Sequence, residues 1–254
     1  MDLQPYYYGQ GKVFGGMRVN GVVKSLRWLL DVSALDAEFQ VEVKKAKESY
    51  SGQAATVVKI IAGKSASLSM TAMQRSSENL ALFLHGTATK GIAGTVTGEA
   101  LPAGLAAGDR IALAHPAVTN LVLTDAAATP VPVDASKYVL DPTYGAIDIK
   151  DVTGTTQPWK AAYSYGAAES VSIFTSPQPE FFLRYEGINL ADEGKPVIAE
   201  FYRVSTDPLK KLSMISSGDI AGMEVTGEIM LDPTRAYSAE FGQFGRLVQL
   251  PAAA

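Results

Sequence analysis

Few residues in this chain have the types and spacing that enzyme chemistry requires. The two histidines, His85 and His115, have no catalytic partner close to them in the sequence, and no Gly-x-Ser-x-Gly elbow accompanies the serines. His85 comes at the end of an expected helix, where a basic side chain interacts favourably with the helix dipole. The absence of cysteine excludes disulfides, thiolate nucleophiles and cysteine-based zinc sites.

Two further patterns resemble ligand sites but lack necessary parts. Gly63-Lys64-Ser65 copies the end of a phosphate-binding loop, but Val58 stands where that motif needs its first glycine. Four carboxylates fall among expected turns without the spacing of a calcium loop: Asp134, Asp141, Asp148 and Asp151. A sugar-cleaving site usually comes with exposed tryptophans, and the chain has two in all. We therefore expect a protein that is not an enzyme and holds no cofactor or metal.

The composition further narrows the classes of protein that this sequence could represent. The chain has 254 residues, 47% of them hydrophobic, which is enough for one large β domain or two smaller ones. A net charge of −4 argues against a protein that grips nucleic acid, because such binding requires a basic surface. Neither a signal peptide nor a run of about 18–20 apolar residues is present, so we expect production in a cytoplasm without a membrane anchor.

The elements that would position a functional surface are mostly strands. The alternation of polar and apolar residues over Asp36–Val43 predicts a strand with one face in the core and one acidic face in contact with solvent. The core face would contain Ala37, Phe39, Val41 and Val43, and the acidic face Asp36, Glu38, Gln40 and Glu42. A returning strand repeats the pattern, with serines opposite Ala66, Leu68, Met70 and Ala72, so the pair reads as a long hairpin. Its segment Thr56–Ile61 is apolar on both faces, so something must cover it.

Other signals mark a turn, a helix and an insertion. Asn20-Gly21 suits a tight hairpin, and Ser77–His85 predicts a short helix with a serine at its start and Gly86 as its C-cap. From Thr87 to about Ala168 the chain becomes rich in Ala, Gly, Thr, Val and Pro, which indicates an inserted small β domain. Longer strands return over Phe181–Ile188, Pro196–Val204 and Met223–Leu231.

Three blocks give the sequence a family likeness. They are Lys47-Glu48-Ser49-Tyr50-Ser51-Gly52-Gln53, Gly63–Met70 and Ser77–Gly86, preceded by Gly11-Lys12-Val13-Phe14 and Arg27–Leu35. In this order they resemble the major tail tube proteins of long-tailed, siphophage-like bacteriophages. The likeness covers roughly residues 10 to 86.

The resemblance implies a mainly β fold, a β-sandwich or half-barrel with one flanking α-helix, plus the inserted small β domain. It divides the chain into an N-terminal arm (1–10), a tail tube domain (11–86 and 176–254) and the insert (87–175). Such proteins form hexameric rings that stack into a tube, in which DNA passes through the lumen without specific binding. The implied location is the tail of the virion, assembled in the host cytoplasm, and the implied partners are further copies of the chain, a tape measure protein, a distal tail protein and a tail terminator.

Carried onto this chain, the likeness assigns three sets of residues. The turn Lys47, Glu48, Ser49, Tyr50, Ser51, Gly52 and Gln53 would reach the next ring. The arm with Tyr6, Tyr7 and Tyr8 would have a similar role, against the alternative of a disordered terminus. Glu38, Gln40 and Glu42 would line the lumen, against the alternative of an ordinary solvated sheet face.

Two other functions remain open at this point. One is a related ring-forming part, such as a tail terminator or the tube of an injection system. The other is a carbohydrate-binding or adhesion module, which aromatic rows on one face of the insert would favour.

Overall fold

The computed structural model, which describes residues 6–218 and 220–251, is mainly β. The chain divides into two compact units, each described here by itself. The first contains the chain up to Thr87 and from Val171 onward, and the second contains Ala88–Ser170. The second unit therefore begins one residue and ends five residues inside the segment 87–175 that the sequence marks as an insert.

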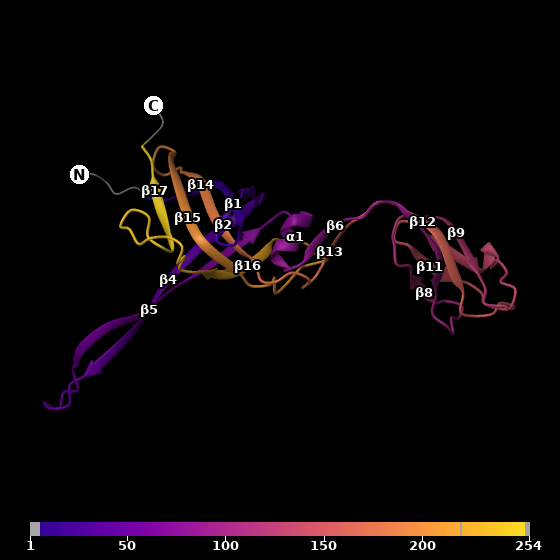
Figure 1. The fold of residues 1–254 in the computed structure, drawn as a ribbon, viewed down its shortest axis with the longest axis horizontal. Helices are drawn as coiled ribbons and strands as arrows, with labels where there is room; N and C mark the ends of the chain where they lie inside the picture. The colour runs from indigo at the N-terminus through magenta and orange to yellow at the C-terminus, as the bar shows by residue number, and fades with distance from the viewer. Residues whose placement is uncertain (1–5, 219, 252–254) are drawn as a thin grey trace. The chain divides into compact units, whose positions relative to one another are not determined.

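In the described part of the first unit, nine strands form one antiparallel sheet (Figure 1). Its main path is β2-β1-β14-β15-β16-β5-β4, with β3 paired to β1 and β17 paired to β15. The strands are β1 (Gly9–Val19), β2 (Val22–Val23), β3 (Arg27–Trp28), β4 (Val32–Lys47), β5 (Thr56–Ala72), β14 (Glu180–Asn189), β15 (Lys195–Thr206), β16 (Met223–Ile229) and β17 (Gly245–Gln249). The predicted tight hairpin is confirmed, because Asn20 and Gly21 both take positive φ between β1 and β2.

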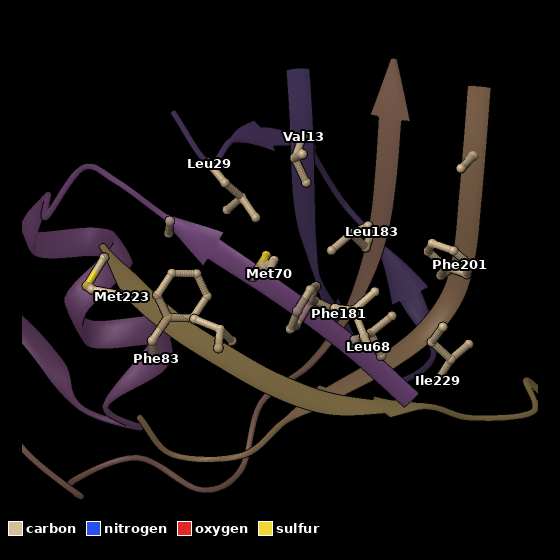
Figure 2. Close-up of a cluster of buried hydrophobic side chains, with 14 of the residues drawn as sticks. Val13, Leu29, Leu68, Met70, Phe83, Phe181, Leu183, Phe201, Met223 and Ile229 are labelled. Atoms are coloured by element: carbon tan, nitrogen blue, oxygen red, sulfur yellow. The ribbon is translucent and has the colours of Figure 1, made fainter. Parts of the chain in front are cut away.

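The core of this unit lies where the sheet folds over itself. Side chains from β1, β14 and β15 point toward those from β5 and β16, as Figure 2 shows for Val13, Leu183, Phe201, Leu68 and Met70. The predicted buried face of the returning strand is confirmed in β5: Ala66, Leu68, Met70 and Ala72 are all buried.

The described part of this unit contains one short α-helix, α1 (Ser77–Phe83). Its Phe83 side chain packs into that core. The side chain of Ser76 caps it by accepting a hydrogen bond from the N–H of Asn79 (3.2 Å). The prediction that Gly86 supplies the left-handed C-cap is wrong, because His85 takes the positive φ of 48°. Gly86 is needed for a different reason: a Cβ there would lie 2.1 Å from the carbonyl oxygen of Ser172.

A buried ion pair ties the C-terminal segment to the first strand. Arg18 of β1 donates to both carboxylate oxygens of Asp232, at 2.8 and 3.0 Å, and to the carbonyl of Tyr202 at 2.7 Å. Both side chains are almost completely buried. Burial alone would raise the pKa of Asp232, but hydrogen bonds from Arg18 and Thr234 outweigh it and lower that pKa to about 2.

The second unit has its own core. Its strands are β7 (Gly94–Ala100), β8 (Arg110–Ala112), β9 (Val118–Thr124), β10 (Tyr138–Asp141), β11 (Ala146–Ile149) and β12 (Lys160–Tyr165), with a 3₁₀ turn η1 at Ala135–Lys137. They form two three-stranded sheets, β10-β11-β8 and β7-β12-β9, around a core that includes Trp159 and Ile147. Where the chain enters and leaves this unit, β6 (Thr87–Lys90) pairs with β13 (Glu169–Ser172).

Candidate assembly surface

The most unusual surface of the first unit is the long hairpin of β4 and β5. The two strands pair from Val32↔Ala72 to Lys47↔Thr56, and the hairpin extends well beyond the strands that cover its base (Figure 1). Its base is held in the core through Leu68 and Met70 of β5. The next strand, β16, pairs with β5 only between Ala66 and Ala72, so the outer half of the hairpin has no third strand beside it within residues 6–218 and 220–251.

The apolar side chains of this outer half are exposed. Phe39 and Val41 were predicted to be core residues, which is wrong for this chain taken alone, because they are 69% and 53% exposed. The reason is that the covering strands end near Ala66, which is the cross-strand partner of Phe39. The described part of the chain does not supply the cover that we expect over Thr56–Ile61, since Val57, Val58, Ile60 and Ile61 are all exposed.

The face of the hairpin opposite to Phe39 and Val41 carries carboxylate and hydroxyl side chains. Residues paired across an antiparallel ladder point to the same face, so the register places the side chains in rows. The rows are Ala34–Thr71–Glu224, Asp36–Ser69–Thr226, Glu38–Ser67–Glu228, Gln40–Ser65 and Glu42–Gly63. These rows contain no lysine or arginine. The three candidate lumen residues, Glu38, Gln40 and Glu42, all lie on this face and are exposed.

Four strands of this sheet have one partner each, and so a free edge, in the described part of the chain: the two-residue strands β2 and β3 and the longer strands β4 and β17. β4 pairs only with β5, and β17 pairs only with β15. Over Val32–Val43 the edge of β4 carries neither proline nor lysine, the residues that usually protect such an edge. Its outer end does carry Lys44, Lys45 and Lys47. The unprotected part can therefore accept a further strand.

An open groove of about 810 Å³ lies between the two arms of the folded sheet. Leu35 and Phe39 of β4 line one side, and Tyr185, Phe201 and Leu247 line the other. The groove shows that β4 does not close against β1, β14 and β17 within one chain. Its lining is mixed, and the side chains of Leu35, Phe39, Phe201 and Leu247 add to the apolar surface that the chain leaves uncovered.

The turn that joins β4 to β5 contains the candidate inter-ring residues. Lys47 ends β4 and pairs with Thr56, while Ser49, Tyr50, Ser51, Gly52 and Gln53 are exposed. Glu48 differs from its neighbours: its carboxylate faces back into the turn and accepts hydrogen bonds from Tyr50 and Ser51. The turn thus has a defined internal hydrogen-bond network.

The N-terminal residues lie against their own chain. Gly9 and Gln10, predicted to belong to an arm, are the first residues of β1 and pair with β14. The side chain of Asn189 accepts from the N–H of Tyr8 (2.9 Å) and donates to the carbonyl of Tyr6 (2.9 Å). Tyr6, Tyr7 and Tyr8 nevertheless keep exposed rings. Residues 1–5 of the expected arm lie outside the described residues.

A family model described as "Protein of unknown function UCP028589" matches residues 6–248. The chain belongs to the UCP028589 family. No curated protein matches it. The matched range of this UCP028589 member runs through both compact units and includes the whole β4–β5 hairpin.

The residues considered for chemistry have structural partners in this UCP028589 member. The Nε2–H group of His85 donates to the carbonyl of Thr206 (3.1 Å), and His115 stacks on Tyr165 with ring centres 3.8 Å apart. Gly63-Lys64-Ser65 lies within β5 rather than in a loop that could surround a phosphate. Within residues 6–218 and 220–251, no three His, Asp or Glu side chains gather as metal ligands would.

The four turn carboxylates of the second unit also have partners within the chain. Asp141 and Asp148 both bind Arg110, and Asp151 binds Lys137. Asp134 caps η1 by accepting from the N–H of Ser136 (2.8 Å). In the described part of the chain, no helix has the length and apolar character needed to cross a membrane.

Proposed function

We propose that the protein is the structural subunit of a bacteriophage tail tube, in which hexameric rings stack into a conduit for DNA. The observation that carries the proposal is the outer half of the β4–β5 hairpin. It presents apolar side chains that its own chain does not cover, beside a strand edge without a partner. A soluble protein rarely keeps both features unless another chain completes the sheet.

The acidic face supports a role in conducting DNA. Five carboxylates, those of Asp36, Glu38, Glu42, Glu224 and Glu228, lie in its rows without a basic residue among them. Basic residues would bind phosphates, whereas an acidic and hydroxylated wall lets a polyanion slide past. In the proposed tube this face lines the lumen, and the exposed apolar side chains of the outer half, which lie on both faces of the hairpin near its turn, pack against neighbouring subunits. The location would then be the virion tail, with assembly in the host cytoplasm.

The adhesion alternative receives little support from the second unit. Within Ala88–Ser170, Trp159 and Tyr163 are buried in the core. Tyr144 is the aromatic side chain of this unit that is largely exposed. A sugar-binding face normally presents several aromatic rings together, and a lone exposed tyrosine does not form such a row.

Negative-stain electron microscopy of the purified protein, combined with sedimentation, tests the proposal. We expect rings at low concentration and tubes of stacked rings as the concentration rises. Single rings that never stack would instead indicate a tail terminator. A particle that sediments as a monomer at every concentration would contradict the proposed function.

A further inference from the structure

Glu48 is buried at a place where almost everything around it is exposed. It retains 9% of its accessible surface, although it lies in the turn at the far end of the hairpin. Its Oε2 atom accepts hydrogen bonds from the N–H of Tyr50 (3.0 Å) and of Ser51 (2.8 Å). Its Oε1 atom accepts from the hydroxyl of Ser51. The N–H of Glu48 donates to the carbonyl of Ala55 (2.8 Å), which closes the turn.

These hydrogen bonds keep the carboxylate charged and the turn ordered. Hydrogen bonds from the side chain and then the backbone of Ser51 lower the pKa of Glu48 to about 2, although burial acts in the other direction. Among the residues that the structure describes, the buried cluster of this unit ends on β5 at Ala66, so this core is not close enough to hold the turn. The Glu48 carboxylate is therefore the group that fixes the backbone of residues 49–51.

The turn that Glu48 fixes has the composition of a recognition loop. Tyr50 is 85% exposed, and its neighbours are Ser49, Ser51, Gly52 and Gln53. Tyrosine beside serine and glycine is typical of binding loops, because a rigid amphipathic ring gives a large contact area at a small entropic cost. Holding such a loop in its bound shape before contact strengthens binding, since less order is lost on association.

The charge of the hairpin indicates the kind of surface it meets. Residues 41–64 contain five lysines and two glutamates, a charge of +3, which leaves −7 on the rest of the chain. Lys45 and Lys59 are direct cross-strand partners and point to the same face. Among the described residues neither forms an ion pair, so their mutual repulsion is uncompensated within one chain. An acidic surface would relieve this repulsion, and a second copy carries net negative charge outside its own hairpin.

We propose that Glu48 is a positioning residue for self-assembly: it pre-orders the turn so that Tyr50 anchors the hairpin on an acidic surface of a second copy. This inference rests on the proposed function, since it requires that copies of the chain associate. It also changes the role of one candidate inter-ring residue. Glu48 acts through the turn, and Tyr50 makes the contact.

The test compares variants of the turn and of the hairpin by sedimentation over a range of protein concentrations. Glu48→Gln removes the charged acceptor, and Ser51→Ala removes one of its donors. Glu42→Gln is the matched control, because it makes the same charge change on the same hairpin at an exposed side chain. Both neutralisations make the hairpin more positive, so an effect of net charge alone would appear equally in both.

We expect Glu48→Gln to raise the concentration needed for assembly about tenfold, through loss of pre-organisation. Ser51→Ala should act in the same direction, and the double variant Glu48→Gln/Ser51→Ala should be no worse than Glu48→Gln, because both remove one network. Tyr50→Ala should weaken assembly with the turn intact. Thermal unfolding of all these variants should match that of wild type, which separates positioning from folding.

The possible failures are distinguishable. If the wild-type chain assembles and Glu48→Gln assembles at the same concentration as Glu42→Gln, the positioning role of Glu48 is overturned. If Tyr50→Ala assembles normally, its role as the anchor is overturned. A wild-type chain that stays monomeric at every concentration overturns the proposed function together with this inference. Replacing Lys45 and Lys59 with glutamine should reduce the salt dependence of assembly, and an unchanged salt dependence would argue against an acidic partner surface.

Discussion

The double substitution Ile60→Ser/Ile61→Ser should impair assembly without harming the fold. Ile60 and Ile61 are 57% and 56% exposed, so about half of each side chain remains for a neighbour to bury. Complete burial of such a side chain contributes about 1.5–3 kcal/mol, so the remaining half is worth about 1 kcal/mol. The pair therefore contributes about 2 kcal/mol to a contact between subunits, which corresponds to a roughly thirtyfold change in the concentration needed for assembly.

Light scattering against protein concentration measures this change, and thermal unfolding serves as the check on folding. Ile92→Ser/Ile215→Ser is the matched control, since both side chains are more than 80% exposed and lie outside the hairpin (85% and 93%). We expect the control to assemble like wild type and both variants to unfold at the wild-type temperature. Assembly of Ile60→Ser/Ile61→Ser at wild-type concentrations would refute the argument that this surface is covered by another copy.

Three further predictions concern the lumen, the turn and the buried ion pair. The double substitution Glu38→Lys/Glu42→Lys should leave tubes intact but slow DNA passage, because new cations on the acidic face would bind phosphates. Infectivity of phage that carry this variant measures the effect. Wild-type infectivity would count against a lumen role for this face. Deletion of Tyr50–Gln53 should permit folding, measured by circular dichroism, yet block polymerisation, and normal tubes in micrographs would contradict this. Asp232→Asn should lower the free energy of unfolding in urea by about 3 kcal/mol, because it leaves Arg18 buried without its counter-charge. Since the pKa of Asp232 is lowered to about 2 in the fold, its contribution to the free energy of unfolding is present above about pH 4 and is lost as the pH falls toward 2. An Asp232→Asn variant with the same acid sensitivity as wild type would contradict this prediction.

Local patterns in the sequence were sufficient for the strands and the helix start. The alternation from Ala66 to Ala72 predicts which face of β5 is buried, because side chains of a strand point alternately to its two faces. Asn20-Gly21 and Ser76 act through backbone geometry and a single hydrogen bond over a few residues. These features depend on neighbours in the sequence, so the sequence pattern is enough to find them.

Features that depend on distant residues could not be predicted in the same way. Whether Phe39 is covered depends on where β16 stops pairing with β5, some 190 residues further along the chain. The tether of Tyr8 requires Asn189 at the end of another strand. His85 takes the left-handed position, and the neighbouring Gly86 makes the close approach to Ser172 from a distant strand. In each case the amino-acid type is compatible with several environments, and tertiary contacts select one.

Hydrogen exchange of the β4 backbone amides tests the central claim most directly. In the dissociated chain, the alternate N–H groups of Val32–Val43 that point away from β5 have no strand to bond to and should exchange within the earliest time points. In assembled protein the same amides should become protected, because a strand of another copy would accept their hydrogen bonds. Equal exchange of these amides before and after assembly would contradict the claim that the sheet is completed by a second chain.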